Sequence, residues 1–176
     1  MPLSRPACIP AVINFVWENN IQSILDLGIG FGGYGVLFRQ TMDVRWGRVK
    51  ENEWTATLHG VEVNNEYQNP AWDVYNIVHI DRIEKFLPFA EKYQLIFFGD
   101  VLEHFPKEEA LKLIEIAKER ADFIIVTTPN TFAGNEAEAD RFHNHHEAHQ
   151  CLIEGQDMPG FTREQYDNQQ VFIWRR

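Results

Sequence analysis

Five short apolar runs recur along the chain, and each is bounded by a glycine, aspartate, asparagine or proline. Two of them contain four consecutive apolar residues, at Leu95–Phe98 and Phe123–Val126. Strands buried on both faces of a parallel sheet require this pattern. The runs therefore predict five strands, at Ser23–Leu27, Leu58–Val63, Tyr75–Ile80, Leu95–Gly99 and Phe123–Thr128.

Helical patterns lie between some of these strands. Gly35–Thr41 follows the first strand, and Lys107–Arg120 carries apolar residues on one face at a period of 3.6. Pro106 stands just before the second segment, where proline suits the first turn of a helix. Strands that alternate with helices predict an α/β fold, with a doubly wound, mostly parallel sheet covered on both faces.

Two polar stretches interrupt this rhythm. Asp43–Thr57 indicates an insertion before the second strand, and Thr131–Phe161, rich in His, Glu, Asn and Gly, indicates a long irregular segment. Long segments of this kind are usually functional or mobile in compact domains. Beyond them, we expect a short helix at Thr162–Tyr166 and a last strand at Val171–Trp174, all within a single domain, 1–176.

The charge balance limits the choice of partners. The chain has 26 acidic residues against 16 Lys and Arg, a formal net charge of −10. An acidic surface repels phosphate backbones, so we expect no nucleic-acid partner. No apolar run is long enough to span a bilayer, and no secretory signal begins the chain, so we expect a soluble cytoplasmic protein without membrane insertion.

A glycine-rich turn follows the first strand. Gly28, Gly30 and Gly33 satisfy Gly-x-Gly-x-x-Gly, a pattern that is weak evidence alone. Asp26, two residues earlier, is more informative, because its carboxylate would repel a pyrophosphate by on the order of a few kcal/mol. A positively charged ligand fits this turn better; a dinucleotide and a turn without ligand are the alternatives.

Acidic residues also stand at the ends of the next three predicted strands: Glu62, Asp81 and Asp100. Glu62 is placed to accept hydrogen bonds from ribose hydroxyls, and Asp81 lies where an adenine amino group could be read. Each acid alone is more often a solvated strand end or a helix cap. Together they indicate a ligand site, because ligands of open α/β sheets bind outside the carboxyl ends of the strands.

From about Ile21 to Asn130 the chain resembles class I S-adenosylmethionine-dependent methyltransferases. More narrowly, Asp100–Phe105 resembles the group with an Asp-Val-x-Glu-His-Phe segment after the fourth strand, which includes ubiquinone-type O-methyltransferases and enzymes acting on sugars and secondary metabolites. The resemblance implies a Rossmann-like sheet and S-adenosylmethionine as cofactor, a ligand whose ammonium and sulfonium suit Asp26.

The resemblance also implies roles for individual residues. Asp26 and the Gly28–Gly32 loop would hold the methionine end, Glu62 the ribose and Asp81 the adenine, while Asp100 would line the methyl-donor pocket. The implied cofactor-binding residues are Asp26, Gly28, Ile29, Gly30, Gly32, Glu62, Val63, Asp81 and Asp100.

The tail departs from the family pattern. A helix and two strands are expected after the fifth strand, but only Val171–Trp174 resembles a strand. We therefore expect a sheet truncated after strand 5 relative to the seven-stranded methyltransferase fold. The acceptor site would then be open, completed by a second copy or a partner protein, or formed by Thr131–Phe161.

His104 is the nearest titratable group to the predicted pocket and our candidate general base; the alternative is a packing or capping residue. Asp100, Glu103 and His104 also match a divalent-cation spacing of some ubiquinone-type members. A histidine cluster follows, which we interpret as a polar loop rather than a metal site. We assign no metal. The cluster comprises His143, His145, His146 and His149.

Three functions compete. The first is methyl transfer to a small-molecule or sugar-containing acceptor. The second is a methyltransferase-like module that binds the cofactor without catalysis, and the third is an NAD-dependent oxidoreductase, which Asp26 disfavours.

Overall fold

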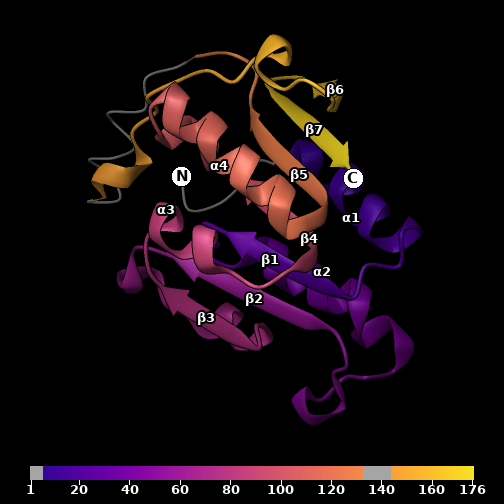
Figure 1. Cartoon of the computed structure of the whole chain (residues 1–176). Helices are drawn as coiled ribbons and strands as arrows, with labels where there is room; N and C mark the ends of the chain where they lie inside the picture. Colours follow the sequence, from indigo (N-terminus) through magenta and orange to yellow (C-terminus); the bar gives the residue numbers. More distant parts are fainter. Residues whose placement is uncertain (1–5, 133–143) are drawn as a thin grey trace.

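A computed structural model of the chain describes residues 6–132 and 144–176. Within these ranges seven strands form one sheet in the order β3-β2-β1-β4-β5-β7-β6 (Figure 1). The strands are β1 (Ser23–Leu27), β2 (Thr57–Glu62), β3 (Ile77–Ile80), β4 (Tyr93–Gly99), β5 (Ala121–Pro129), β6 (Thr162–Tyr166) and β7 (Gln169–Arg175). The helices are α1 (Ile9–Glu18), α2 (Gly33–Met42), α3 (Ile83–Phe86) and α4 (Lys107–Arg120).

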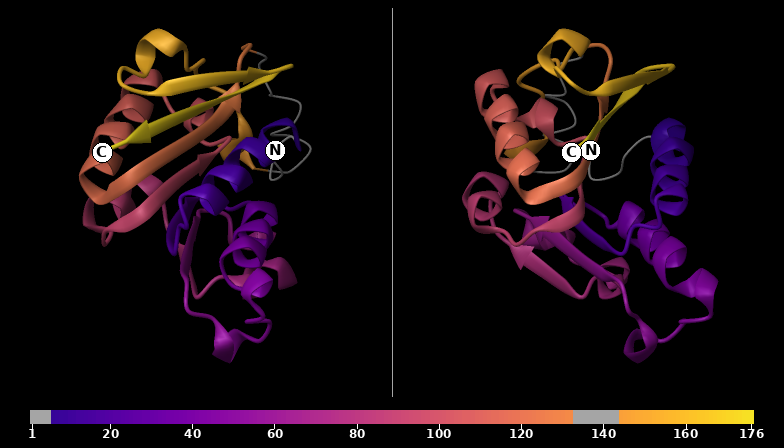
Figure 2. Two further views of the ribbon diagram at one scale, coloured as in Figure 1. Left: turned by 90° about the vertical axis from the view of Figure 1, so that its right-hand side faces the viewer. Right: turned by 45° about the vertical axis from the view of Figure 1, so that its right-hand side comes forward.

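Helices cover both faces of this sheet, with α1 and α4 on opposite sides (Figure 2). Strand β4 shows why: Phe97 contributes to the core cluster under α1 and α2, while its neighbours Ile96 and Phe98 contribute to the cluster under α4. All three side chains are fully buried. None of the helices in the described ranges has the length and apolar character that crossing a membrane requires.

The predicted truncation after strand 5 is wrong. Strands β6 and β7 follow β5 and complete a seven-stranded sheet. The sheet is also mixed, because β7 pairs antiparallel with both β5 and β6, whereas the other neighbouring strands pair in parallel. The segment Thr162–Tyr166, predicted as a short helix, is β6.

Strand β6 lies at the edge of the sheet, which explains why the sequence pattern did not predict it. Four of its five side chains are exposed, so the strand buries no apolar face and shows no apolar alternation. Strand β7 begins with Gln169 and Gln170, which are polar yet buried. Their amides find partners inside the protein, since Gln170 Nε2 donates to the Pro129 and Ile153 carbonyls at 3.0 and 2.7 Å.

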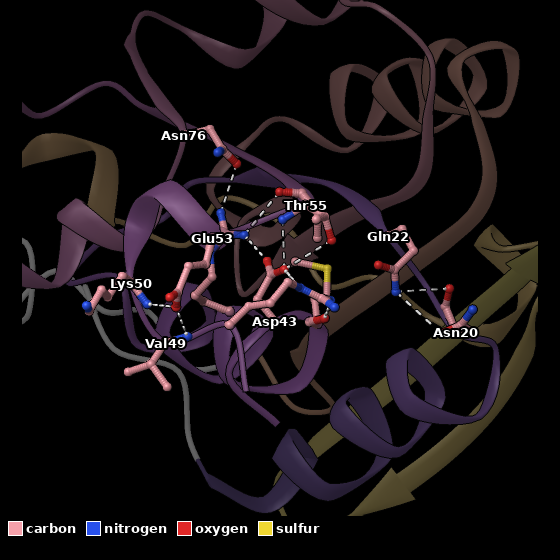
Figure 3. Close-up of polar contacts among 12 residues, drawn as sticks. Asn20, Gln22, Asp43, Val49, Lys50, Glu53, Thr55 and Asn76 are labelled. Atoms are coloured by element: carbon pink, nitrogen blue, oxygen red, sulfur yellow. Dashed lines mark hydrogen bonds and ion pairs between the residues drawn. The ribbon is translucent and has the colours of Figure 1, made fainter. Parts of the chain in front are cut away.

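The predicted insertion 43–57 is organised by a buried ion pair. Arg39 of α2 is 2% exposed and donates to the carboxylate of Asp43, which is fully buried. Asp43 Oδ1 also accepts hydrogen bonds from Arg48 Nε at 2.6 Å and from the Thr55 amide at 2.9 Å. Asp43 thus lies at the centre of the polar contacts drawn in Figure 3.

The remaining donors of Arg39 reach the segment before β3. Its Nε donates to the Val74 carbonyl at 3.0 Å and its Nη2 to Asn76 Oδ1 at 2.8 Å. The guanidinium carbon also lies 4.1 Å from the ring centre of Trp54. One buried cation therefore joins α2 to the insertion and to the chain between β2 and β3.

We predict that Asp43→Asn destabilises the fold by about 3–5 kcal/mol, because breaking a buried ion pair leaves Arg39 charged and uncompensated. Urea unfolding at pH 7 measures the free energy. Glu119→Gln, on the exposed side of α4, serves as the control and should change the free energy by less than about 0.5 kcal/mol.

The same pair predicts an acid dependence. Burial raises the pKa of Asp43, but the hydrogen bonds from Thr55, Arg48 and Arg39 outweigh burial and hold it below 3.8. A depressed folded-state pKa gives stability that is present above about pH 4 and is lost as the pH falls further. The difference between wild type and Asp43→Asn should therefore shrink below pH 4; a constant difference would contradict this account.

Candidate functional site

A cavity of about 550 Å³ opens at the carboxyl ends of β1, β2 and β4. This volume lies in the range of small-molecule sites. Most of the residues predicted to bind a cofactor line it, together with His104: Asp26, Gly28, Ile29, Gly30, Glu62, Val63 and Asp100. Gly32 and Asp81 do not line the cavity.

The glycine loop has the backbone conformation that its sequence suggested. Gly28 and Gly32 have φ values of +72° and +91°, in the left-handed region where glycine is preferred. A Cβ on Gly28 would also lie 2.4 Å from Val101 Cγ2. Trp72, a residue outside the loop, stabilises it, because its buried indole donates a hydrogen bond to the Gly30 carbonyl at 2.8 Å.

Asp26 is buried beneath this loop. It is 2% exposed, and Oδ2 accepts a hydrogen bond from the Tyr75 hydroxyl at 2.7 Å. Burial raises the pKa of Asp26 to about 7, opposed by the Tyr75 hydrogen bond and aided by Glu62. Gly35 leaves room for the tyrosine, since a Cβ there would lie 2.2 Å from the Tyr75 ring. Sequence reasoning missed this role of Tyr75.

Glu62 joins the end of β2 to the glycine loop. Its Oε2 accepts from the Gly30 amide at 2.8 Å, and its Oε1 from the Val63 and Asn64 amides at 3.0 and 2.9 Å. Burial nevertheless raises the pKa of Glu62 above its ordinary value. Because each carboxylate oxygen accepts about two hydrogen bonds, Oε2 can still accept one from a ligand.

Asp81, unlike Asp26, Glu62 and Asp100, does not line the cavity. Its side chain is exposed, and Oδ1 accepts from the Arg82 amide at 2.7 Å. The cavity wall beside it is made by Arg82, Ile83 and Glu84 instead. The hydrogen bond of Asp81 is thus a local one to the next residue, and its contact with adenine stays a prediction.

Asp100 is held in part by strand β7, at a residue that precedes the predicted strand Val171–Trp174. Its backbone has a φ of +53°, and its amide donates to the Thr127 carbonyl at 3.0 Å. Its Oδ1 accepts from Gln169 Nε2 of β7 at 3.0 Å. Strand β7 therefore fixes a side chain in the cavity wall as well as completing the sheet.

His104 lies on a short 3₁₀ turn, Leu102–His104, after β4. Its Nδ1 lies 3.4 Å from the Ala148 carbonyl, which can only accept, so Nδ1 carries the proton and Nε2 keeps its lone pair. Burial lowers the pKa of His104 to about 4, with a further lowering by His149 and an opposing effect of Glu147. The imidazole is therefore neutral at pH 7.

The segment that begins at Asn144 is joined to this turn. The Gln150 amide donates to the Glu103 carbonyl at 2.7 Å, and Gln150 Nε2 donates to the His104 carbonyl at 2.6 Å. Asn144, His146, Glu147 and Gln150 all line the cavity. The described part of Thr131–Phe161 thus forms one wall of the cavity, and its role in an acceptor site stays a prediction.

A second set of contacts ties the same segment to the chain after β2. The Tyr67 hydroxyl donates to Glu147 Oε1 at 2.9 Å and accepts from Asn144 Nδ2 at 2.9 Å. Tyr67 follows the predicted ribose residue Glu62 by five positions. The described part of Thr131–Phe161 is therefore held both to the turn after β4 and to the chain after β2.

Three side chains of the types that ligate metals meet beside the cavity. Ligand atoms of Glu103, His104 and His149 lie within 4.8 Å of one another. Glu103 is 2% exposed, and its Oε1 has no hydrogen-bond partner among the described residues. Sequence spacing had pointed to Asp100 as third member, whereas the fold supplies His149. Of the other clustered histidines, His143 lies outside the described residues.

The pKa of Asp26 yields a stability prediction. Between about pH 4 and pH 7 the folded chain keeps a proton on Asp26 that the unfolded chain has released, so the free energy of unfolding falls as the pH rises through this window. Asp26→Asn keeps an acceptor for Tyr75 and removes the titration. We expect it to be more stable than wild type at pH 8, by on the order of a few kcal/mol.

Urea unfolding of both proteins at pH 4 and pH 8 checks this expectation. The advantage of Asp26→Asn should be small at pH 4 and large at pH 8. Asp73→Asn, an exposed acid outside the cavity, should show no such dependence. Equal differences at both pH values would refute the proposed titration of Asp26.

Comparison with known proteins gives three informative structures. A magnesium protoporphyrin IX methyltransferase (ChlM) from Synechocystis PCC 6803, with SAH bound, has a TM-score of 0.62 and 16% identity, over 94% of this chain and 80% of that chain. The N-terminal domain of EvdMO1, with SAH bound, has a TM-score of 0.66 and 12% identity, over 98% and 82%.

The third is the methyltransferase domain of bacterial CtHen1-C, with a TM-score of 0.61 and 16% identity over 96% of both chains. No protein-family model matches the chain, and no curated protein matches its sequence. At such identities these likenesses establish the architecture alone. The chain has the fold of class I S-adenosylmethionine-dependent methyltransferases.

Proposed function

We propose that this protein is a methyltransferase that takes its methyl group from S-adenosylmethionine and transfers it to a small-molecule or sugar-containing acceptor. The charge of the cavity is the observation that carries the proposal. Within the described residues, six acids and one arginine line it. A sulfonium and an ammonium are attracted by that surface, whereas the pyrophosphate of NAD is repelled.

The position of these acids supports the same ligand. Asp26 and Asp100 flank the glycine loop at the ends of β1 and β4, where the methionine end would lie. Glu62, at the end of β2, keeps an acceptor position for a ribose hydroxyl. Two structures of this fold, those of ChlM and EvdMO1, hold SAH.

The same charge favours a small acceptor over a polyanion. The net charge of −10 and the acidic wall oppose a phosphate backbone. Hen1, whose bacterial domain has this fold, is named as a small RNA methyltransferase, so RNA is the acceptor that a test has to include.

His104 is our proposed general base. Methyl transfer to a hydroxyl forms an oxygen–carbon bond while the carbon–sulfur bond breaks, and the hydroxyl proton needs an acceptor. Neutral His104 offers Nε2 for this proton, because Nδ1 already faces the Ala148 carbonyl. The remaining task of the site is to align acceptor and donor.

One observation favours a different role for His104, that of a ligand to a divalent cation. Glu103, His104 and His149 have the oxygen and imidazole donors that divalent cations accept, and the unpartnered Oε1 of Glu103 suits a cation. A cation held there would polarise an acceptor hydroxyl and lower its pKa. His104 would then act as a ligand instead of a base.

The first test concerns the cofactor. Isothermal titration calorimetry should detect binding of S-adenosylmethionine and S-adenosylhomocysteine, but no binding of NAD. Asp26→Asn should weaken binding of both by about tenfold, the effect of losing one charge-assisted contact. Asp73→Asn should bind like wild type. Binding of NAD without S-adenosylhomocysteine would contradict the proposed function.

The second test concerns His104. In a screen of hydroxylated small molecules, sugars and a short RNA, wild type should methylate a non-nucleic-acid acceptor. His104→Gln should keep cofactor affinity and lower kcat by about 10²–10⁴-fold. Methylation of RNA alone would contradict the acceptor class. Unchanged turnover of a folded His104→Gln variant would remove this residue from catalysis.

Chelation distinguishes base from ligand. If His104 is the base, EDTA leaves kcat unchanged and His149→Ala has little effect. Loss of activity with EDTA, restored by a divalent cation and mimicked by His149→Ala, would assign Glu103, His104 and His149 to a cation instead.

A further inference from the structure

Strand β3 is an edge of the sheet whose outer backbone groups are unpaired. It ends the strand order, and no helix or strand of the described chain lies beyond it in Figure 1. The Asn76 amide, just before β3, donates to the Leu58 carbonyl of β2 at 2.8 Å. Because backbone groups alternate in direction along a strand, Val78 also faces β2, while Ile77 and His79 face outward. The outward N–H and C=O groups of these two residues have no hydrogen-bond partner among the described residues.

The side chains of β3 expose apolar surface on both faces of this edge. Ile77 is 47% exposed and lies on the face that α3 covers, because His79, two positions on, contacts Phe86 of α3. Ile80 is 49% exposed and lies on the other face. Water therefore reaches apolar side chains on either side of the unpaired backbone.

The opposite edge of the sheet, β6, has a different character. Four of its five side chains are exposed, and they include Arg163 and Glu164. Charged side chains are one means by which edge strands resist pairing with other chains. Strand β3, with the sequence Ile-Val-His-Ile, contains no Asp, Glu, Lys, Arg or Pro. The contrast indicates that β3 is the edge open to a further strand.

Charge and symmetry favour a second copy of this chain as the source of that strand. A net charge of −10 opposes the approach of two copies, so they meet best where the surface is neutral. Just after β3, Arg82 is paired with Glu84, which keeps this edge neutral. Two identical strands can pair antiparallel about a twofold axis. With the axis at Val78, Ile77 of each copy lies opposite His79 of the other, and the outward groups of both copies are satisfied.

We propose that two copies of this protein associate through antiparallel pairing of β3, about a twofold axis at Val78, and so join their sheets. Standard interfaces use about 20–30 residues a side, more than this edge supplies, so the dimer is reversible, with a Kd on the order of tens of micromolar. Because the paired strands run in opposite directions, the two cavities open at opposite ends of the joint sheet. The inference does not depend on the proposed function.

The first test measures association directly. Sedimentation velocity at concentrations on either side of that Kd should show a monomer–dimer equilibrium. Ile77→Lys should raise the Kd by about tenfold or more, because a charge on an edge strand opposes pairing. Gln165→Lys, which adds the same charge to β6, should dimerise like wild type. Both variants change the net charge equally, so a difference between them reports where the charge lies. Ile77 is half exposed, so Ile77→Lys should melt close to wild type.

The second test measures the register. In the proposed pair the two residues at position 78 face each other without hydrogen bonds, with Cα atoms about 4.5 Å apart, which a disulfide can span. Mild oxidation should therefore link Val78→Cys into a covalent dimer, whereas Gln165→Cys should stay monomeric. The native Cys8 and Cys151 are buried and give no background.

Three outcomes would overturn the inference. A wild type that stays monomeric leaves this edge to a strand of another protein. A dimer that persists unchanged in Ile77→Lys, without cross-linking of Val78→Cys, forms through another surface. Equal cross-linking of Val78→Cys and Gln165→Cys reports random collision instead of a specific pair.

Discussion

The organisation of the site depends on the burial of one cation, the guanidinium of Arg39. A buried charge is tolerated only where its hydrogen-bonding capacity is met, and Arg39 meets it with Asp43, Val74, Ala56 and Asn76. These partners come from three separate stretches of the chain. The requirement to satisfy Arg39 therefore fixes the insertion and the chain before β3 against α2.

Two aromatic residues connect the chain before β3 to the cavity. The chain before β3 includes the 3₁₀ turn Pro70–Val74, which carries Trp72, and then Tyr75. Trp72 holds the glycine loop through the Gly30 carbonyl, and Tyr75 holds Asp26. A rigid loop loses little conformational freedom when a ligand binds, so this support favours affinity. The insertion is thus linked, through Arg39 and the chain before β3, to residues that support the cavity, although it does not line the cavity.

The sequence predicted the parts of the fold that depend on local pattern. Strand β1 and helix α4 have the predicted bounds, because an apolar run bounded by glycine and an amphipathic segment after Pro106 are both local signals. Strand β6 could not be predicted from apolar alternation, since it buries almost no side chain. The start of β7 was concealed because Gln169 and Gln170 are buried through hydrogen bonds rather than through apolar surface.

The residues of the candidate site likewise fall into those that the sequence predicted and those that it could not. Residues at strand ends, such as Asp26 and Glu62, could be assigned to the cavity because topology alone brings the carboxyl ends of parallel strands together. The pairing of Asp26 with Tyr75 spans 49 positions, and His149 meets Glu103 although the two lie on opposite sides of α4 and β5 in the sequence. Contacts of this kind depend on three-dimensional packing, and no spacing in the sequence indicates them.

The bond from Gln169 to Asp100 has a consequence for biosynthesis. Translation produces the glycine loop, every acid of the cavity wall and Gln150 before it reaches β7. The nascent chain can therefore form five parallel strands while Asp100 still lacks the amide that holds it. The hairpin of β6 and β7 therefore supplies a support for the cavity wall, the amide that holds Asp100, that is synthesised after all the acids that line the cavity in the described residues.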